Sequence, residues 1–497
     1  MRDVTLPILV NGELVHHTDA PPHVVTYETD CRITIPRVTE AVADDVLKAS
    51  RLALSELHLD EITVFLNKVG RLWADPDYQG RKDAVELAAQ ITGYHPVMLQ
   101  GDYQRIARAC DRAKLYDILE TDLGDPLLLD DWIPRQSVFL RAVPKGRIVH
   151  LMVGNVPLAG LFTIVRGLLT KNVTVAKLPK RDLVSTLAFA RAFVDVDPSH
   201  PVTRALSVLY WPGGDAIEQK FIDGADVVCA WGQRSSIESV KPKIPIGVDL
   251  LEFGPKESLM FIGGPPEEWG NVALRAAYDI SVYEQEACFS PQRIFVEGDA
   301  DLFAERLAEG LDRVLKRLPG GYVPVDKQAH ITRARQEAKF DGFKVRQSAG
   351  SEWTVVTLPP GEFPSFEHPL GRTVYVYPVN RLEEAVREIH KETQSISVHP
   401  WERGMELGRQ LTLAGAGRVT EVGLMSRPRP GFVHDAIRPL HSMVRWVAVE
   451  RGLDYRGRFR DDSRDEFEAK IFGTAAVGKV SAADSSTAPA PGGQAAP

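Results

Sequence analysis

The chain has 497 residues and a formal net charge of −8, because 67 acidic side chains outnumber 59 lysines and arginines. The hydrophobic fraction of 44% and the charged fraction of 25% are ordinary for a globular protein of about two or three domains. The acidic balance argues against a general basic surface for nucleic acid. Cys31, Cys110, Cys229 and Cys288 are widely spaced. They indicate neither a disulfide framework nor a metal site, and they favour a cytosolic, reducing compartment.

No transmembrane segment is expected. The N-terminal MRDVTLPILVNGE lacks the apolar core of a signal peptide. The longest apolar stretch, residues 148–170, is interrupted by His150, Asn155, Pro157 and Arg166. This pattern predicts a buried strand, a loop and a helix rather than a membrane span.

The first part of the chain combines a hairpin with helices. In residues 8–17, apolar runs flank Asn11-Gly12, which is the strongest short signal for a β-hairpin. Residues 38–130 are expected to be mostly helical.

From about residue 145, strands and helices alternate, which predicts a parallel, doubly wound α/β sheet. We expect strands at 146–154, 172–179, 205–213 and 225–232, with helices from 157 to 169 and at 183–194 and 215–222. ESLMFIG (257–263) is expected to close this region. A second α/β unit then follows, with helices at 269–278, 300–316, 381–391 and 403–413 and strands at 292–297, 352–357 and 373–378. The Ala-, Ser-, Pro- and Gly-rich residues 475–497 are expected to be a disordered tail.

Common nucleotide and hydrolase motifs are absent from the sequence. There is no GxxxxGK[ST], HExxH or GxSxG. GAGRVT (415–420) follows an expected helix rather than a strand, so its glycines indicate a helix stop and a turn. Any nucleotide must therefore be bound by a structural feature other than these motifs.

Two polar residues follow expected strands, at the sheet edge where ligands bind in such folds. GNVP (154–157) follows the first strand, with Gly154 permitting an unusual turn and Pro157 able to begin the next helix. Asn155 is then either an ordinary turn residue or an amide that points into the crevice. Lys177, after the second strand, is either a solubilising lysine or a ligand of a ribose or phosphate.

Two later segments have similar alternatives. In WGQRSS (231–236), Ser235 and Ser236 either cap a helix or belong to a helix N-terminus that holds a pyrophosphate. Glu252, in the apolar LLEFGPKES (250–258), is either paired structurally or has a raised pKa that suits proton transfer.

Cys288 lies in EQEACFSPQRIFVE (284–297), just before an expected strand. A free cysteine is often an inert part of the core. The polar neighbours Gln285, Glu286 and Ser290 instead indicate a partly exposed loop, the setting that a reactive thiolate needs. Cys229 lies inside an apolar strand, and the other two cysteines also lie within expected elements.

In this order, the motifs GNVP, VAKLPK, WGQRSS, LLEFGPKES and EQEACFSPQRIFVE resemble those of the aldehyde dehydrogenase superfamily. The closer resemblance is to the LuxC family of long-chain acyl-CoA reductases. HLMVGNVPLAGLFTIVRGLLTKNVTVAKLPKRD and DISVYEQEACFSPQRIFVE are the most specific stretches, and HDAIRPLHSMVRWVAVE (434–450) is similar to the family's C-terminal region. The resemblance covers about residues 8–470.

The resemblance implies an aldehyde dehydrogenase-like α/β fold. Residues 1–260 would form N-terminal helices and a Rossmann-like cofactor domain, completed by 425–472. Residues 261–424 would form the catalytic domain. The family also has a small oligomerisation element, which implies a homo-oligomer.

The resemblance also assigns roles to single residues. Cys288 would be the nucleophile, Asn155 the oxyanion amide and Glu252 the general base. The cofactor NADPH would be bound by Gly154, Lys177, Pro179, Gly232, Ser235, Ser236 and Glu367. Glu367 lies in FEHPLGRT (366–373), which departs from the superfamily's glutamate, aromatic residue and Gly-Pro. No metal is implied.

The implied reaction is the NADPH-dependent reduction of a fatty acyl thioester, such as acyl-CoA, to the aldehyde through an acyl-cysteine. A hydrolytic NAD(P)-dependent aldehyde dehydrogenase remains an alternative, which Glu252 favours. A cysteine acyl transferase or thioesterase and a non-catalytic scaffold are further alternatives. The acyl donor can be coenzyme A, a carrier protein or an acylated partner, since acyl-transferring and acyl-protein-synthesising subunits occur in the family.

Overall fold

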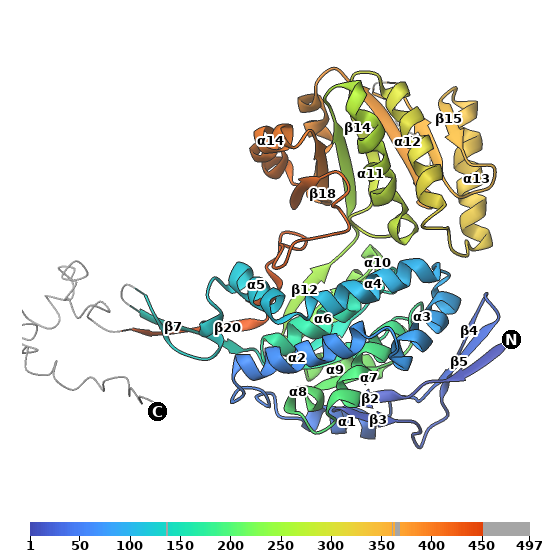
Figure 1. Ribbon diagram of the computed structural model, residues 1–497. Coiled ribbons are helices and arrows are strands. Elements are labelled where there is room, and N and C mark those ends of the chain that lie inside the picture. Colours follow the sequence, from blue (N-terminus) through green and yellow to red (C-terminus); the bar gives the residue numbers. More distant parts are fainter. Residues whose placement is uncertain (136–137, 360, 363–367, 451–497) are drawn as a thin grey trace, which may run out of the picture. The chain divides into compact units, whose positions relative to one another are not determined.

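The computed structural model describes residues 1–135, 138–359, 361–362 and 368–450 (Figure 1). The chain divides into two compact units, Met1–Asp131 with Ala142–Trp446, and Trp132–Arg141 with the residues from Val447 onward. Glu367, the expected tail at 475–497 and residues 451–472 lie outside the described residues. Within the described part of the chain, no helix is long and apolar enough to cross a membrane.

The hairpin expected at Asn11-Gly12 is confirmed. Strands β2 (Ile8–Val10) and β3 (Glu13–Val15) pair antiparallel. Asn11 and Gly12 both have left-handed φ values, 46° and 79°, as a two-residue type I′ turn requires. A Cβ at Gly12 would lie 2.7 Å from the carbonyl oxygen of Thr203, so glycine is needed here for close approach as well.

The expected helical region is also confirmed. Its five α-helices are α1 (Glu40–Lys48), α2 (Leu59–Ala74), α3 (Gln79–Thr92), α4 (Pro96–Ala109) and α5 (Arg112–Leu123). A separate small sheet has the order β1-β5-β4, formed by Arg2–Thr5, Cys31–Ile35 and His23–Tyr27. In α2, Leu66, Val69 and Trp73 are fully buried on one face, as the 3.6-residue period of an amphipathic helix dictates.

The first seven-stranded sheet has the order β12-β11-β8-β9-β10-β2-β3, and its first five strands are parallel. These strands are β8 (Arg147–Leu151), β9 (Val173–Lys177), β10 (Leu206–Leu209), β11 (Val227–Trp231) and β12 (Asp249–Phe253). The helices between them are α6 (Pro157–Leu169), α7 (Ser185–Val196), α8 (Pro201–Arg204), α9 (Ile217–Asp223) and α10 (Arg234–Val240). The predicted doubly wound alternation is therefore confirmed.

This strand order creates a topological switch point. The chain runs from β8 through β9 to β10 on one side, and then returns to place β11 on the other side of β8. Ligands of such sheets bind at the carboxyl ends of the strands that flank the switch. GNVP follows β8 and WGQRSS follows β11, so both motifs are at the switch point.

The second seven-stranded sheet has the order β15-β16-β17-β14-β13-β18-β19. Its strands are β13 (Glu257–Ile262), β14 (Pro291–Glu297), β15 (Lys344–Gln347), β16 (Thr354–Thr357), β17 (Thr373–Val379), β18 (Thr393–His399) and β19 (Arg418–Glu421). Its helices are α11 (Trp269–Ser281), α12 (Ala300–Leu315), α13 (Val325–Phe340) and α14 (Trp401–Ala414).

The second sheet differs from expectation in several places. β13 pairs with β14 and β18, so ESLMFIG opens this sheet and does not close the first one. The expected helix at 381–391 is the 3-10 segment η5 (Leu382–Glu388). The sequence did not predict α13 or β18. In β18, polar residues such as Gln394 and Ser395 are buried, because a central parallel strand is covered on both faces.

The remaining described strands form a three-stranded sheet of order β20-β7-β6. They are β6 (Ile133–Pro134), β7 (Val138–Pro144) and β20 (Val444–Glu450). Near the start of β20, Met443 packs into an apolar cluster with Ile148, Val227 and Phe253 of the first sheet.

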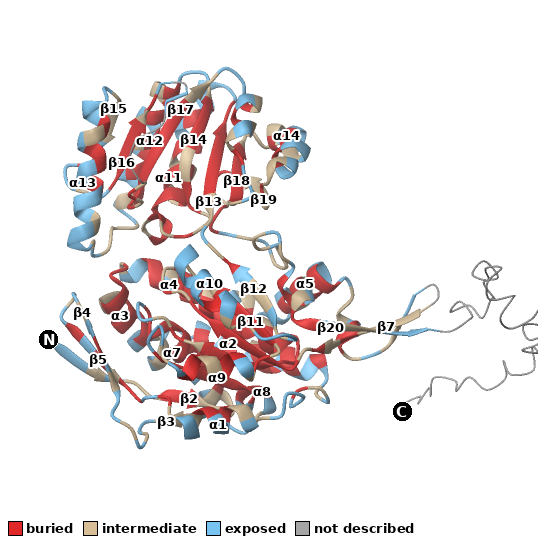
Figure 2. Ribbon diagram, turned by 180° about the vertical axis from the view of Figure 1, so that it is seen from behind, coloured by how far each residue is buried: buried red, intermediate tan, exposed pale blue. Residues whose placement is uncertain are grey.

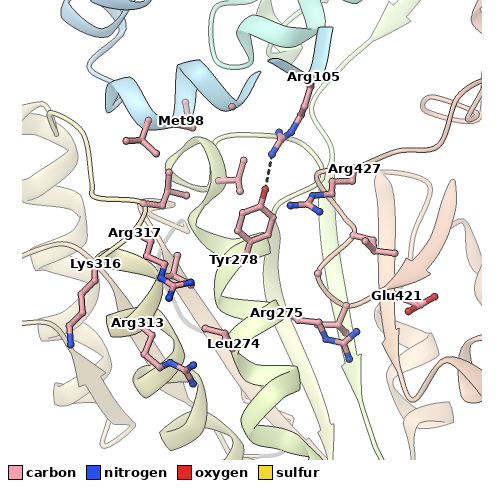
Figure 3. Close-up of a pocket in the computed structure, with 18 residues that line it drawn as sticks. Met98, Arg105, Leu274, Arg275, Tyr278, Arg313, Lys316, Arg317, Glu421 and Arg427 are labelled. Carbon is pink, nitrogen blue, oxygen red and sulfur yellow. Dashed lines mark hydrogen bonds between the residues drawn. The ribbon is translucent and has the colours of Figure 1, made fainter. Parts of the chain in front are cut away.

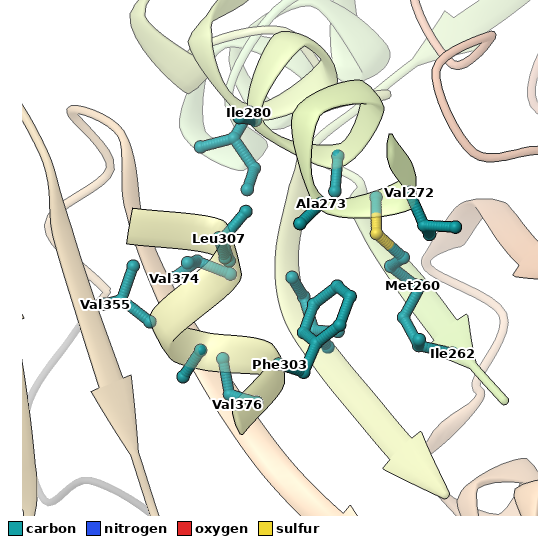
Figure 4. Packing of buried hydrophobic residues seen from close by; sticks show 14 of the residues in the cluster. Met260, Ile262, Val272, Ala273, Ile280, Phe303, Leu307, Val355, Val374 and Val376 are labelled. Carbon is teal, nitrogen blue, oxygen red and sulfur yellow. The ribbon is translucent and has the colours of Figure 1, made fainter. Parts of the chain in front are cut away.

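Buried residues concentrate on the strands of the two large sheets, as Figure 2 shows. In the second sheet, α11 and α12 pack on one face over Met260, Val374 and Val376 (Figure 4). Phe303 of α12 lies fully buried in this cluster. The helix that leads to Cys288 therefore rests on a close-packed core.

We expect Phe303→Ala to lower the free energy of unfolding of this domain by about 3–5 kcal/mol, because it leaves a cavity in a close-packed core. The measurement is the urea midpoint followed by tryptophan fluorescence. Phe340→Ala is the matched control, since Phe340 is 92% exposed and its truncation leaves no cavity. Equal midpoints for the two variants would contradict the packing described here.

Candidate active site

The chain segment before Cys288 has an unusual backbone. Cys288 lies in a loop between the 3-10 segment η4 (Val282–Gln285) and β14. Tyr283, Glu284 and Gln285 have φ values of 55°, 52° and 65°, so three consecutive non-glycine residues are left-handed. Such a conformation is retained only where its surroundings hold each residue in place.

Polar contacts hold these three residues. The Tyr283 hydroxyl donates to Asp102 Oδ1 at 2.6 Å. Glu284 Oε1 accepts from Arg372 Nη2 at 2.8 Å. The Gln285 amide donates to the carbonyl oxygen of Thr373 at 2.5 Å and accepts from the backbone N–H of the same residue at 2.8 Å. The loop is therefore held by two segments of the chain, α4 through Asp102 and residues 372–373 at the start of β17.

The sequence argument for an exposed loop was wrong about the neighbours of Cys288. Gln285 is 1% exposed and Ser290 is fully buried. The Gln285 amide is held by buried hydrogen bonds, whereas the Ser290 hydroxyl is buried without a hydrogen-bond partner among the described residues. Cys288 itself is partly exposed, whereas Cys31, Cys110 and Cys229 are buried.

Glu286 is a second anchor that the sequence did not reveal. Its carboxylate accepts from the Tyr94 hydroxyl at 2.8 Å and lies 2.5 Å from Arg181 Nη2, with Lys327 on its other oxygen. Burial would raise the pKa of Glu286, but Arg181 and Lys327 outweigh burial and hold the pKa below its ordinary value. This carboxylate is therefore a fixed negative charge beneath the loop.

Asn155 joins the GNVP turn to the cysteine loop. Its side-chain Nδ2 donates to the carbonyl oxygen of Glu286 at 2.7 Å, and its own carbonyl accepts from the Tyr94 hydroxyl at 2.6 Å. The Oδ1 atom is buried and has no hydrogen-bond partner within the described ranges. Two motifs that are 131 residues apart in the sequence thus meet at one site.

Gly154 is needed for a different reason from the one expected. It is not among the residues with positive φ, so the turn does not demand glycine for its backbone conformation. A Cβ at this position would lie 2.7 Å from Cβ of Arg181 and 3.3 Å from Cγ of Pro179. Gly154 therefore allows the segment after β9 to lie directly against the turn.

The Cys288 sulfur has two polar neighbours. Gln394 Nε2 of β18 donates to Sγ at 2.9 Å and to Asp435 Oδ1 at 2.7 Å. Burial raises the pKa of the Cys288 thiol to about 12 and the charge of Asp435 adds to this rise, while the Gln394 hydrogen bond opposes it. The resting thiol is therefore protonated near neutral pH.

Asp435 is presented by a strained turn. His434 and Ile437 form an isolated antiparallel bridge, and Asp435 and Ala436 between them have φ values of 51° and 64°. Only 4% of the Asp435 side chain is exposed, and burial raises its pKa. The sequence analysis assigned no role to Gln394 or Asp435. HDAIRPLH, which opens a stretch similar to the LuxC C-terminal region, was the available signal for Asp435.

Glu252 takes the first of its two predicted alternatives. It lies on β12, 40% exposed, and its Oε1 accepts from Lys241 Nζ at 2.8 Å. Among the described residues, no hydrogen bond or ion pair joins it to Cys288 or Asn155. Its role as general base remains a prediction.

Several residues that were predicted to bind the cofactor lie at the switch point. Lys177 ends β9 half-buried, where burial lowers its pKa, and it makes no ion pair within the described chain. Gly232 has no room for a side chain, because a Cβ would lie 2.8 Å from Cβ of Ser236. Ser235 and Ser236 are exposed in the first turn of α10, which has 7 residues. In the described residues, no group of three or more His, Cys, Asp or Glu is placed to hold a metal.

A cavity of about 920 Å³ lies beside α6, the helix that begins after GNVP. We call it the α6 cavity. Leu158, Phe162 and Arg166 of α6 line it together with Phe432. The Arg166 guanidinium lies 5.8 Å from the Phe162 ring and 5.7 Å from the Phe432 ring. Six further basic side chains line the same cavity: Arg71, Arg105, Arg108, Lys114, Arg427 and Arg429. Apolar and basic side chains therefore share this lining.

A model of the family described as acyl-CoA reductase (LuxC) matches residues 54–446. A long-chain acyl-protein thioester reductase of Aliivibrio fischeri is 35% identical over 455 residues, covering 90% of this chain and 94% of the relative. The enzyme of the same name from Photorhabdus luminescens is 36% identical and covers 81% and 85%.

Solved structures of low sequence identity share the fold. A salicylaldehyde dehydrogenase from Pseudomonas putida G7 has a TM-score of 0.71 at 14% identity and covers 91% of this chain and 99% of its own. An NADP-dependent glyceraldehyde-3-phosphate dehydrogenase from Bacillus halodurans C-125 has a TM-score of 0.68 at 16% identity, with 90% and 99% covered. The expected aldehyde dehydrogenase-like α/β fold is therefore confirmed.

We expect opposite effects on the thiol from its two polar neighbours. Asp435→Asn removes a negative charge and lowers the pKa of Cys288, so iodoacetamide alkylation at pH 8 should become several-fold faster, since each pKa unit changes the thiolate fraction about tenfold. Gln394→Leu removes the donor and should slow alkylation. The readout is the mass of the peptide that contains Cys288 over a pH series, with exposed Asp326→Asn as control. Equal acceleration in both variants would indicate only an opened loop.

Proposed function

Since the chain belongs to the LuxC family of acyl-CoA reductases, we propose that it reduces a long-chain fatty acyl thioester to the fatty aldehyde, with Cys288 carrying the acyl group. The observation that carries this proposal is the hydrogen bond from Asn155 to Glu286, which joins a carbonyl-binding amide to the loop of a partly exposed cysteine. The proposed donor is acyl-CoA, and an acylated protein is the alternative that the relatives' names support.

The first proposed step is attack by the Cys288 thiolate on the thioester carbonyl. The Gln394 amide stabilises the thiolate by donating to Sγ. A new carbon–sulfur bond forms to Cys288, the bond to the donor's sulfur breaks, and the donor leaves as a thiol after gaining a proton. The acyl group is then held at one position by a covalent bond.

Asn155 is proposed to stabilise the negative charge that develops on the carbonyl oxygen. Its Nδ2 carries two hydrogens, and one of them forms the hydrogen bond to the carbonyl oxygen of Glu286. The second hydrogen is the one proposed to bind the oxyanion. One such donor contributes about 3 kcal/mol to the transition state. Tyr94 and Glu286 keep the turn and the loop together while this charge forms.

NADPH is the proposed cofactor, and when bound it supplies the hydride that converts the acyl group to the aldehyde level. The crevice at the switch point would hold it. The proposed binding residues are Gly154, Lys177, Pro179, Gly232, Ser235, Ser236 and Glu367, the last of which lies outside the described residues.

The resemblance assigns proton transfer to Glu252, although the Glu252 carboxylate forms an ion pair with Lys241. Asp435 is a second proposed proton carrier, because Gln394 links it to the sulfur and burial raises its pKa. A hydrolytic dehydrogenase needs a free base beside the acyl-cysteine, so the Lys241 ion pair favours reduction over hydrolysis. A thioesterase would leave Lys177 at the switch point without a role.

The four unpaired cysteines support a reducing cytoplasm as the site of action. We also propose a homo-oligomer that receives acyl groups from acyl-transferring and acyl-protein-synthesising partner subunits, on the strength of the family.

Radiolabelled acyl-CoA should leave a hydroxylamine-sensitive adduct that NADPH discharges as aldehyde. Cys288→Ala should leave no adduct, and Asn155→Ala should slow acylation about 100-fold, because one oxyanion donor is lost. Exposed Asn271→Ala is the control and should acylate at the normal rate. Label released as fatty acid without NADPH would instead support a thioesterase.

Lys177→Ala should raise the KM for NADPH about tenfold and change the KM for NADH less. The reason is that the variant lacks the ammonium group proposed to contact the 2′-phosphate, which NADPH has and NADH lacks. The measurement is initial rate against cofactor concentration. Lys180→Ala, an exposed lysine three residues away, should leave both KM values unchanged. Equal losses for the two cofactors would assign Lys177 to the ribose.

A further inference from the structure

A second cavity, of about 780 Å³, lies among α4, α11, the end of α12 and residues 421–427 (Figure 3). Its walls carry an excess of positive charge with a single carboxylate, that of Glu421. The basic residues are Arg105, Arg275, Arg313, Lys316, Arg317 and Arg427. We call this the basic cavity. The local charge of the basic cavity is thus opposite in sign to the net charge of the chain, which is −8.

The floor of the basic cavity is apolar, with Met98, Leu274 and Val282 among its lining residues. Tyr278 lies between two of the cations, as Figure 3 shows. Arg105 Nη2 donates to its hydroxyl at 2.6 Å, and the Arg427 guanidinium lies 5.3 Å from its ring centroid. The positions of these two charges are therefore set by the protein.

Most of these cations have no acidic partner. Arg105 pairs with the buried Asp102 at 3.2 Å. In the described part of the chain, no ion pair joins Arg275, Arg313, Lys316, Arg317 or Arg427 to a carboxylate, and Arg275 Nε is buried without a hydrogen-bond partner. Like charges that share one cavity repel, and a multiply charged anion would relieve this repulsion.

The basic cavity adjoins the parts of the molecule that the proposed reaction uses. Arg105, Tyr278 and Arg427 also line the α6 cavity, so the two cavities share a wall. Val282, on its wall, immediately precedes the left-handed residues that lead to Cys288. A ligand with a polyanionic end would find unpaired cations in the basic cavity, and its hydrocarbon chain would find apolar contacts at Leu158 and Phe162 of the α6 cavity.

We propose that the basic cavity binds the phosphate groups of coenzyme A in the acyl-CoA donor. This inference rests on the proposed function, because it names the donor of the same site. Coenzyme A carries a diphosphate and a 3′-phosphate, and arginine guanidinium groups pair with phosphate oxygens through two parallel hydrogen bonds. Arg313 and Arg317, both exposed near the end of α12, would be the outer contacts.

The test compares two thioesters that carry the same acyl chain, one of coenzyme A and one of N-acetylcysteamine, which has no phosphate. For the double variant Arg313→Glu and Arg317→Glu, kcat/KM for acyl-CoA should fall about tenfold or more, since charged hydrogen bonds are lost. The same ratio for the N-acetylcysteamine thioester should not change. Raising the ionic strength should weaken only the reaction with acyl-CoA.

Arg409→Glu, an exposed charge reversal on α14 outside the cavity, is the matched control and should behave as the unaltered protein. Equal losses with both thioesters, or no loss with either, would overturn the proposal. A third outcome would overturn the proposal in favour of a protein donor. In that outcome the unaltered protein reduces an acylated acidic protein faster than acyl-CoA, and the double variant loses activity towards the acylated protein but not towards acyl-CoA.

Binding of free coenzyme A, measured by calorimetry without turnover, separates this proposal from the proposed function. If the protein reduces neither thioester but binds coenzyme A through Arg313 and Arg317, the function fails and the phosphate site stands. If it reduces the N-acetylcysteamine thioester but the double variant binds coenzyme A as tightly as the unaltered protein, the function stands and the phosphate site fails.

Discussion

The candidate active site depends on the left-handed backbone of Tyr283, Glu284 and Gln285. Each non-glycine residue in this conformation costs about 1–2 kcal/mol, so the segment would relax if it were exposed. Buried hydrogen bonds and an ion pair to separate elements oppose that relaxation. Because the reversal of direction before Cys288 follows from this backbone, the position of the sulfur is set by groups far from it in sequence.

Buried polar contacts also explain the charged side chains that surround Glu286 in the cysteine loop. Glu286 is buried, which costs free energy unless partners compensate for lost water. Arg181 in the loop after β9, Lys327 in α13 and Tyr94 in the loop between α3 and α4 provide that compensation. The carbonyl of the same residue receives the Asn155 amide. One residue thus joins the turn after β8, the segment after β9 and the loop that carries Cys288.

The sequence predicted the parts of the fold that have strong periodicity. The alternation from β8 to β11 and the hairpin at Asn11-Gly12 were read from apolar runs and turn residues. β18 was missed because its buried side chains are polar, and a single sequence does not show that a central strand covers them. β13 was placed in the wrong sheet, because the sequence of a strand does not indicate which strands it pairs with.

The candidate site shows the same limit. Cys288 and Asn155 were recognised because their motifs are local, and the structure joins their loops. Gln394 has an ordinary local sequence, and the only signal for Asp435 was the family-like stretch that begins at His434; the tertiary fold places Gln394 between Asp435 and the sulfur. Glu252 lies in an apolar stretch of sequence but pairs with the exposed Lys241. This is possible because β12 is an edge strand of its sheet and is partly open to solvent.

The high pKa of the resting Cys288 thiol also bears on chemical durability. Peroxides attack thiolates, and a thiol that stays protonated near neutral pH moves only slowly towards sulfenic acid. A sulfur that stays protonated beside Asp435 therefore reacts with peroxide more slowly than a free thiolate. The environment that holds back the proposed attack by Cys288 would thus also slow oxidation of its sulfur.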